Sequence, residues 1–282
     1  MLISGVTMTK PEVIFFGNGP LAKYTLEVIT PSANIIFHAK NKEDLETVKS
    51  IKIEHPNAIG ILASFGVLIK SDCLDLFEPE GILNIHPSLL PSYRGASPIE
   101  SAILAGDTDF SVSIMKLVKA MDAGPIYHQE TLRNPVLDKD KLYKALATAG
   151  STWLVNNLAN FKQFHTTANQ NLFPEYHIQD DSKATFTAKL EKSQSQLTPE
   201  LDSASTTLRK IIAFQGYPKP KYNFFGYDVI ILSAHLESSY PDNSKKLSIK
   251  CADNQYVVVD YLQPLSRKPM DANSFLNGIK NK

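Results

Sequence analysis

The sequence predicts a doubly wound α/β domain followed by a small β-rich domain. Short apolar runs alternate with amphipathic helical stretches over residues 12–160, an order typical of a parallel sheet with helices on both faces. Residues 165–205 then lose periodicity and become rich in Thr, Ser, Gln, Asn and Lys, which is typical of an extended connection. After residue 206 the chain is β-rich with few helices, so a small barrel is the expected closure. We therefore expect a Rossmann-like domain at residues 1–185, a linker at 186–205 and a barrel domain at 206–282.

The elements of both domains follow in a regular order. Residues 1–10 are expected to form a loose tail, with Met8 as an alternative start. Ser97–Glu100 has the pattern of a capping box, with Pro98 at the first helical position. The predicted strands are 13–16, 35–37, 58–65, 81–86, 110–118, 125–132, 222–232, 246–251 and 256–261, with 110–118 and 125–132 pairing antiparallel, and the predicted helices are 20–29, 41–55, 71–77, 98–105, 139–160 and 206–214.

The composition describes a globular chain with an uneven charge distribution. The 282 residues hold 29 Lys and Arg against 29 Asp and Glu, and 43% are hydrophobic. Residues 206–282 nevertheless carry 11 Lys and Arg against 6 Asp and Glu. Two interpretations stay open for this basic part: it meets a polyanion such as RNA, or it is a solvated basic face.

Several classes of protein are not indicated. No run approaches the ~20 apolar residues of a membrane span, and the first ten residues lack the pattern of a signal peptide. Cys73 and Cys251 are the two cysteines, far apart and without neighbouring ligand patterns, so neither a disulfide framework nor a metal site is expected. We therefore expect a soluble cytoplasmic monomer that binds no membrane.

The turn after the first strand, Gly17-x-Gly19-x-x-Ala22, loosely matches a dinucleotide-binding fingerprint. That mechanism needs an acidic residue at the end of the next strand to bind the ribose, and His38-Ala39-Lys40 stands there instead. We expect the glycines to serve a tight turn and close helix packing. A nicotinamide-dependent dehydrogenase is kept as an alternative.

Polar residues gather at the end of the strand predicted at 81–86. Side chains on a strand alternate between faces, so Asn84 and His86 share one face while Ile85 points into the core. Pro87 ends the strand at the carboxyl edge, where open parallel sheets bind their ligands. Asp122, in the turn after residue 118, is the third candidate. The structural alternative is that these groups serve local hydrogen bonding only.

The residues around these candidates carry a family resemblance. The stretch from Gly81 continues as Asn84-Ile85-His86-Pro87-Ser88-Leu89-Leu90-Pro91 and then Arg94-Gly95-Ala96-Ser97-Pro98-Ile99, followed by Met121-Asp122-Ala123-Gly124. These segments closely resemble those of the folate-dependent formyltransferases, and the resemblance covers about residues 12–280.

The resemblance implies a reaction and a role for each matched residue. The formyl donor would be 10-formyltetrahydrofolate, with no metal, and the second domain would be OB-like. Transfer passes through a tetrahedral intermediate, whose oxyanion a preorganised donor stabilises by typically ~2.7–4 kcal/mol. The resemblance assigns Asn84 and His86 as donors to the formyl oxygen, Asp122 as the orienting group and proton relay, and Ser88, Leu89, Leu90 and Pro91 to the folate site.

The acceptor is less well determined by the sequence. The basic second domain favours initiator methionyl-tRNA, whereas a sugar-nucleotide N-formyltransferase with the same donor is the alternative. The family's tRNA enzymes usually carry a Gly- and Arg-rich insertion after the second strand, and here His38-Ala39-Lys40 passes almost directly into a helix. A non-catalytic RNA-binding protein with this fold is a further hypothesis. Such a protein would not need Asn84, His86 and Asp122, which we call the polar trio. The role of Arg94 stays open between a surface ion pair and a contact to substrate.

Overall fold

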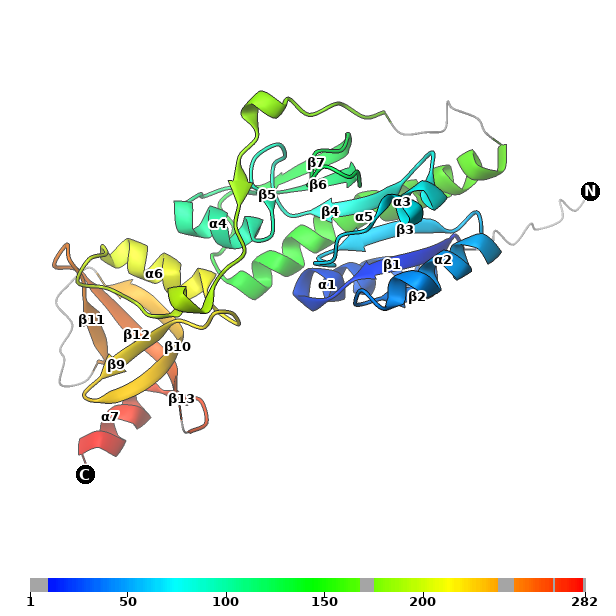
Figure 1. Cartoon of the computed structure of the whole chain (residues 1–282). Coiled ribbons are helices and arrows are strands. Elements are labelled where there is room, and N and C mark those ends of the chain that lie inside the picture. The colour runs from blue at the N-terminus through cyan, green and yellow to red at the C-terminus, as the bar shows by residue number, and fades with distance from the viewer. Residues whose placement is uncertain (1–9, 168–174, 238–245, 266, 281–282) are drawn as a thin grey trace, which may run out of the picture. The chain divides into compact units, whose positions relative to one another are not determined.

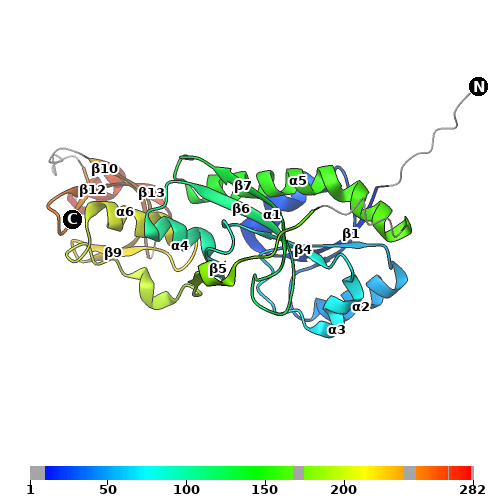
Figure 2. The same ribbon diagram turned by 90° about the horizontal axis from the view of Figure 1, so that it is seen from above.

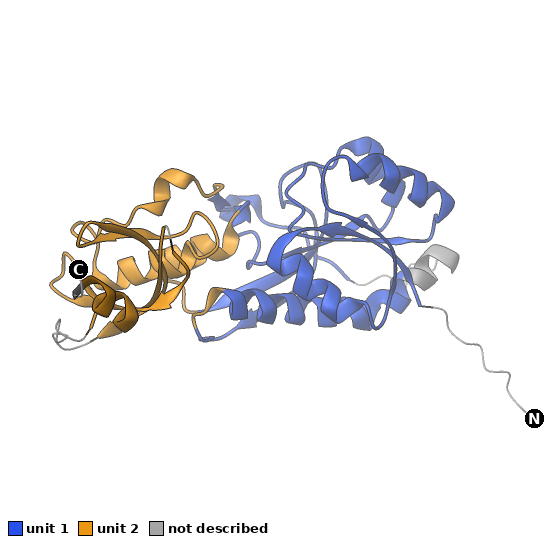
Figure 3. Ribbon diagram, turned by 90° about the horizontal axis from the view of Figure 1, so that it is seen from below, with its two compact units in different colours: residues 1–96, 109–136, 140–187 blue, residues 97–108, 137–139, 188–282 orange. Residues whose placement is uncertain are grey.

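The computed structural model describes residues 10–167, 175–237, 246–265 and 267–280, so Met8 and nearly all of the expected tail lie outside it. The chain divides into two compact units, each described here by itself (Figure 3). The predicted limits of domains and linker stay a prediction. Unit 1 comprises Met1–Ala96, Asp109–Val136 and Asp140–Thr187, and unit 2 comprises Ser97–Thr108, Leu137–Lys139 and Ala188–Lys282.

Unit 1 is built on a six-stranded sheet of order β2-β1-β3-β4-β6-β7 (Figure 1). The first four strands run parallel, which confirms the doubly wound prediction, and β6 pairs antiparallel with β7 as expected. The antiparallel pairing of β4 with β6 was not predicted. The strands are β1 (Glu12–Gly17), β2 (Asn34–Ala39), β3 (Ile59–Ala63), β4 (Ile82–His86), β6 (Phe110–Lys116) and β7 (Ile126–Leu132).

Helices cover both faces of this sheet (Figure 2). Apolar side chains of α2, α3 and the 3-10 turn at Asp75–Phe77 form one buried cluster with β1 and β3. On the other face α5 packs close to β4, since a Cβ on its Gly150 would lie 3.3 Å from Ile85. The helices of unit 1 are α1 (Gly19–Ile29), α2 (Asp44–Glu54), α3 (Ser71–Leu74) and α5 (Lys139–Thr167).

Unit 2 is the predicted small β-rich domain, seen as an antiparallel half-barrel of order β11-β12-β10-β9 with β13 beside β12. Its core holds buried Ile211, Val229, Ile231, Val257 and Leu262. The elements are α4 (Pro98–Ala105), α6 (Ala204–Ala213), β9 (Lys221–Phe224), β10 (Tyr227–Glu237), β11 (Ser248–Lys250), β12 (Tyr256–Pro264), β13 (Met270–Asp271) and α7 (Ala272–Lys280).

A buried ion pair explains why α4 belongs to unit 2. The Lys139 ammonium lies 2.8 Å from Glu100 on α4 and donates to the carbonyls of Ala213 and Gln215, at the end of α6. The capping box expected at Ser97–Glu100 is wrong, because both side chains are engaged elsewhere: the Ser97 hydroxyl donates to the Ala188 carbonyl.

No helix in the described part of the chain is long and apolar enough to cross a bilayer. Within the same residues, no group of three or more His, Cys, Asp or Glu side chains could hold a metal ion.

Candidate active site

Strand β4 places Asn84 and His86 together, as the alternation predicts. Ile85 points toward α5 on one face, and the two polar side chains lie on the other, each 5% exposed. Along the neighbouring strand, Asn84 is paired with Met115 and His86 with Ser113. Burial of two polar groups on one face requires hydrogen-bond partners there, because an unpaired buried polar group is costly.

The connection between β6 and β7 supplies the third side chain. Because β6 runs antiparallel to β4, its last residue, Lys116, pairs with Leu83 near the start of β4. The chain then bends back over the face that carries Asn84 and His86. The bend is tight: Asp122 has a φ of 49°, and a Cβ on Gly124 would lie 1.8 Å from the Lys116 carbonyl oxygen. The turn at 120–124 therefore requires a glycine at its end.

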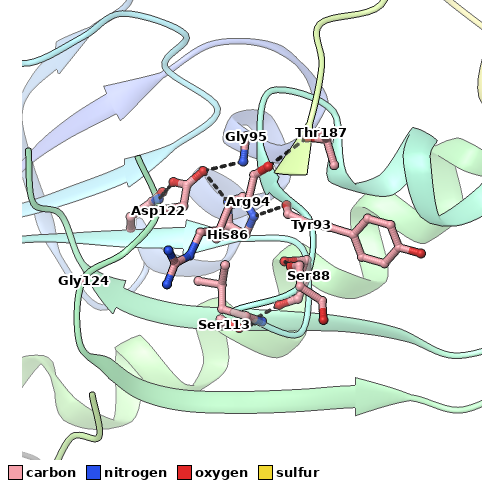
Figure 4. Close-up of polar contacts among 12 residues, drawn as sticks. His86, Ser88, Tyr93, Arg94, Gly95, Ser113, Asp122, Gly124 and Thr187 are labelled. Atoms are coloured by element: carbon pink, nitrogen blue, oxygen red, sulfur yellow. Dashed lines mark hydrogen bonds and ion pairs between the residues drawn. The ribbon is translucent and has the colours of Figure 1, made fainter. Parts of the chain in front are cut away.

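The Asp122 carboxylate contacts both polar side chains of β4, and Figure 4 draws its contacts with His86 and with the Gly95 N–H. Its Oδ2 accepts a hydrogen bond from the Gly95 backbone N–H at 2.8 Å and lies 3.6 Å from His86 Nδ1. Its Oδ1 accepts from Asn84 Nδ2 at 3.4 Å. The structure thus brings together the three residues that the sequence singled out, from two segments 36 positions apart.

A backbone carbonyl fixes the tautomer of His86. Its Nε2 lies 3.0 Å from the Tyr93 carbonyl oxygen, which can only accept, so Nε2 carries the proton of the neutral ring. Nδ1 consequently faces Asp122 with its lone pair. A second proton on the ring would reside on Nδ1, directly opposite the carboxylate, which suits this pair to holding and moving one proton.

The four residues predicted for the folate site, in the loop after His86, differ in burial. The Ser88 hydroxyl donates to the Ser92 carbonyl, and Leu90 is buried against Met115. Pro91 is half-buried, whereas Leu89 is 49% exposed. Leu89 is therefore the member of the set with an exposed apolar side chain.

Residues 175–187, which we call the return segment, pack back onto this loop. The Thr185 hydroxyl accepts from the Tyr93 N–H at 2.8 Å, and the Thr185 carbonyl accepts from the Arg94 N–H at 2.8 Å. Phe186–Thr187 (β8) pairs in parallel with Arg94–Gly95 (β5). This part of the extended connection predicted over residues 165–205 thus packs within unit 1.

Arg94 is buried, and its contacts go beyond a single surface ion pair. Its buried guanidinium donates from Nε and from a terminal nitrogen to Gln179 Oε1, at 3.1 and 2.7 Å, and that terminal nitrogen also contacts the exposed carboxylate of Asp181. Gln179 and Thr185 were missed from the sequence. The one sequence feature at these positions is that residues 165–205 lose periodicity and are rich in polar residues, Gln and Thr among them.

A pocket of about 600 Å³ lies over the turn after β1, lined in part by Gly17, Lys23, His38 and Lys40. Gly17 serves close packing as expected, since a Cβ there would lie 2.2 Å from the Ala63 carbonyl. The acidic lining residue, Glu27, comes from α1 and not from the end of β2. The arrangement does not match the ribose contact of a dinucleotide site.

Comparison with known proteins identifies relatives. A family model described as formyl transferase matches residues 8–158. A methionyl-tRNA formyltransferase of Pseudoalteromonas translucida is 33% identical over 235 residues, which cover 78% of this chain and 69% of the relative. One of Dictyoglomus thermophilum is 31% identical over 256 residues, covering 86% and 78%.

Solved structures show the same fold. HypX from Aquifex aeolicus in complex with tetrahydrofolic acid has a TM-score of 0.70 at 17% identity, and the match covers 94% of this chain and 46% of HypX, about half its length. Methionyl-tRNA formyltransferase from Clostridium thermocellum has a TM-score of 0.63 at 15% identity, covering 94% and 100%. WlaRD, a sugar 3N-formyl transferase, has a TM-score of 0.61 at 17% identity, covering 92% and 99%.

Proposed function

The chain belongs to the formyl transferase family, and from this premise we propose that it formylates initiator methionyl-tRNA with 10-formyltetrahydrofolate as donor. The reaction belongs to translation initiation, in the cytoplasm. Two observations support the proposal. The amide, imidazole and carboxylate of the trio converge on one face of β4, and methionyl-tRNA formyltransferases are about 30% identical over most of this chain.

Asn84 is proposed to stabilise the formyl oxygen as it becomes anionic. One N–H of its amide is directed at Asp122 over a long 3.4 Å, which leaves the other N–H for a ligand oxygen. His86 is the second donor, although its Nε2–H is engaged by the Tyr93 carbonyl. A formyl oxygen must therefore share that N–H with Tyr93 or replace the carbonyl.

Asp122 and His86 are proposed to handle the proton. A bond forms between the acceptor nitrogen and the formyl carbon, the bond from that carbon to the folate nitrogen breaks, and one proton passes from the acceptor amine to the folate nitrogen. The facing Oδ2 and Nδ1 atoms, 3.6 Å apart, offer a place to hold that proton during the exchange. No nucleophilic side chain is needed.

The loop 88–91 is proposed to bind the folate. Hydrogen bonds fix its backbone: Ser113 Oγ donates to the Ser88 carbonyl, and Gln129 donates to the Leu90 carbonyl. These bonds fix the backbone from which the exposed Leu89 side chain projects. Apolar contact with a fixed side chain favours the binding of a flat ring system.

A sugar-nucleotide N-formyltransferase is the second candidate. The observation in its favour is the short connection between β2 and α2, residues 40–43, which leaves little chain at that place for gripping a tRNA acceptor stem. The match to WlaRD over 92% of this chain agrees with either acceptor.

The deciding experiment offers both acceptors to the purified protein with 10-formyltetrahydrofolate. We expect formyl transfer to charged initiator tRNA and no transfer to amino-sugar nucleotides. Transfer to the sugar alone would replace the proposal with the second candidate. Binding of methionyl-tRNA without any turnover would instead indicate an RNA-binding protein that retains the fold.

A further inference from the structure

Gln179 of the return segment has a side chain whose hydrogen-bonding capacity is filled. It is 8% exposed. Its Nε2 donates to the backbone carbonyls of Asp122 and Gly124 at 2.8 and 2.7 Å. Its Oε1 accepts two hydrogen bonds from Arg94. An amide has two donors and two acceptor positions, so all four are used.

This pattern fixes which way the amide points. In the reverse orientation the NH₂ group would face the guanidinium donors, and the oxygen would face two carbonyl oxygens. A single side chain therefore connects two segments that are distant in sequence: the turn 120–124, through its backbone, and the loop 91–95, through the Arg94 guanidinium.

Those two segments carry the partners of the Asp122 carboxylate. Gly95, directly after Arg94, donates its N–H to Asp122 Oδ2. Asp122 itself has a left-handed φ of 49°, which an L-residue adopts only when surrounding contacts hold it there. The Gln179 amide bonds the carbonyl of this strained residue.

We propose that Gln179 is a positioning residue, whose amide locks the turn 120–124 to the Arg94 loop and so sets the distance from Asp122 to His86. The inference rests on the proposed function for its kinetic consequences. Gln179 makes no hydrogen bond with the side chains of Asn84, His86 or Asp122. It acts through the backbone of Asp122 and the side chain of Arg94.

The kinetic test is the Gln179→Ala variant, with each substrate varied in turn. A misplacement of about 1 Å costs on the order of 10²-fold, so we expect kcat to fall by ~10-fold to 10²-fold with KM changed by less than about 3-fold. Gln179→Glu keeps an acceptor for Arg94 but sets an oxygen against the carbonyls of Asp122 and Gly124. It should lose kcat as Gln179→Ala does, which tests the donor half separately.

A double-mutant cycle separates positioning from general loss of structure. If Gln179 acts through Asp122, then Gln179→Ala made in an Asp122→Asn background should cost less than about 3-fold further. An equal loss in both backgrounds would overturn the inference. The matched control is Gln215→Ala in unit 2, which also removes an amide bonded to a backbone carbonyl, that of Leu232, and should keep its activity.

An acceptor-independent measurement separates this inference from the proposed function. Nitrogen-15 NMR of the His86 imidazole should show the proton on Nε2 in the parent protein, and the Nδ1 signal should move in Gln179→Ala and stay in Gln215→Ala. If the Nδ1 signal moves in Gln179→Ala while the parent protein formylates no acceptor, the proposed function is wrong and the positioning role is supported. Unchanged signals, or an unchanged kcat in an active enzyme, would overturn the positioning role.

Discussion

Two loops of unit 1 follow buried parallel strands and differ in what their polar groups do. After β1, the polar side chains bond the backbone of the turn: Asn18 Oδ1 accepts from the adjacent Gly19 N–H, and His38 Nε2, from the neighbouring strand β2, donates to the Gly17 carbonyl. After β4, the partners of His86 and Asp122 come from three segments of chain. A pocket accompanies the first loop, yet the converging polar groups lie at the second.

The difference teaches that position in a sheet does not define a reactive site. Both loops occupy the end of a strand, where ligands of open α/β sheets bind. The polar groups of the second converge because the β6–β7 connection bends back over β4 and because the return segment bonds that bend to the loop 91–95. At the second loop the polar side chains contact one another, whereas at the first loop they bond the backbone of the turn.

The largest effect is expected from the trio itself. Asn84→Ala, His86→Ala and Asp122→Ala should each lower formyl transfer by at least ~10²-fold, as loss of an oxyanion or proton-transfer group does. Lys23→Ala at the β1 loop should stay within about 2-fold of the parent. Initial rates at saturating donor check both. Near-parental activity of any trio variant would remove that residue from the mechanism.

A matched pair of glycines tests the two loops more finely. Gly95→Ala would place a Cβ 2.4 Å from the Thr187 carbonyl at a φ of 116°, disturbing the N–H that Asp122 accepts, so activity should fall by ~10-fold to 10²-fold. Gly19→Ala, at a φ of 83° with open space around it, should cost about 1 kcal/mol of stability and no activity. Urea unfolding and turnover are measured on both. Equal losses of activity in Gly95→Ala and Gly19→Ala would contradict the proposed functional difference between the two loops.

Thr185 provides a smaller test of the return segment. Thr185→Val removes the side-chain acceptor of the Tyr93 N–H, and because this hydrogen bond is exposed it should lower the free energy of unfolding by about 0.5–1.5 kcal/mol. Thr185→Ser keeps the hydroxyl and should recover most of that loss. Denaturant titrations of the three proteins give the comparison, and a Ser variant as unstable as the Val variant would argue against the hydrogen bond.

Lys52 tests whether a buried, perturbed group must be reactive. Its ammonium donates to the Pro56 and Ala58 carbonyls, and burial lowers the pKa of Lys52 from 10.5 to about 8. Between those values the unfolded chain holds a proton that the folded protein does not, so the free energy of unfolding should rise with pH from about 8 toward 10.5. Lys52→Met should lose this rise and keep formyl transfer. A lost activity would place Lys52 in the mechanism.

The smallest effect concerns the pocket after β1. A ligand that binds the native state raises the melting temperature, so nicotinamide dinucleotides at millimolar concentration report on the dehydrogenase alternative. We expect no change in melting temperature and no change in cofactor absorbance. A concentration-dependent rise that Lys40→Ala abolishes would reopen that alternative.

Sequence reasoning reached Asn84 and His86 because their signals are local, whereas Asp122 came from the resemblance of Met121-Asp122-Ala123-Gly124 to the formyltransferases. Alternation places Asn84 beside His86, and Pro87 ends the strand. It could not reach Gln179 and Thr185, because their hydrogen-bond partners lie 55 to 92 positions earlier and are largely backbone groups that any residue type offers. The capping box failed for the same reason: Lys139 and the Ala188 carbonyl, both distant in sequence, compete for its two side chains.

The return segment also determines when the site exists during synthesis. The family match ends at residue 158, before the return segment begins. A nascent chain of that length holds Asn84, His86 and Asp122 but lacks the Gln179 amide and the Thr185 hydroxyl, which bond their loops. From the positioning role that we propose, we expect a fragment that ends at residue 158 to hold the Asp122 turn less firmly than the full chain does.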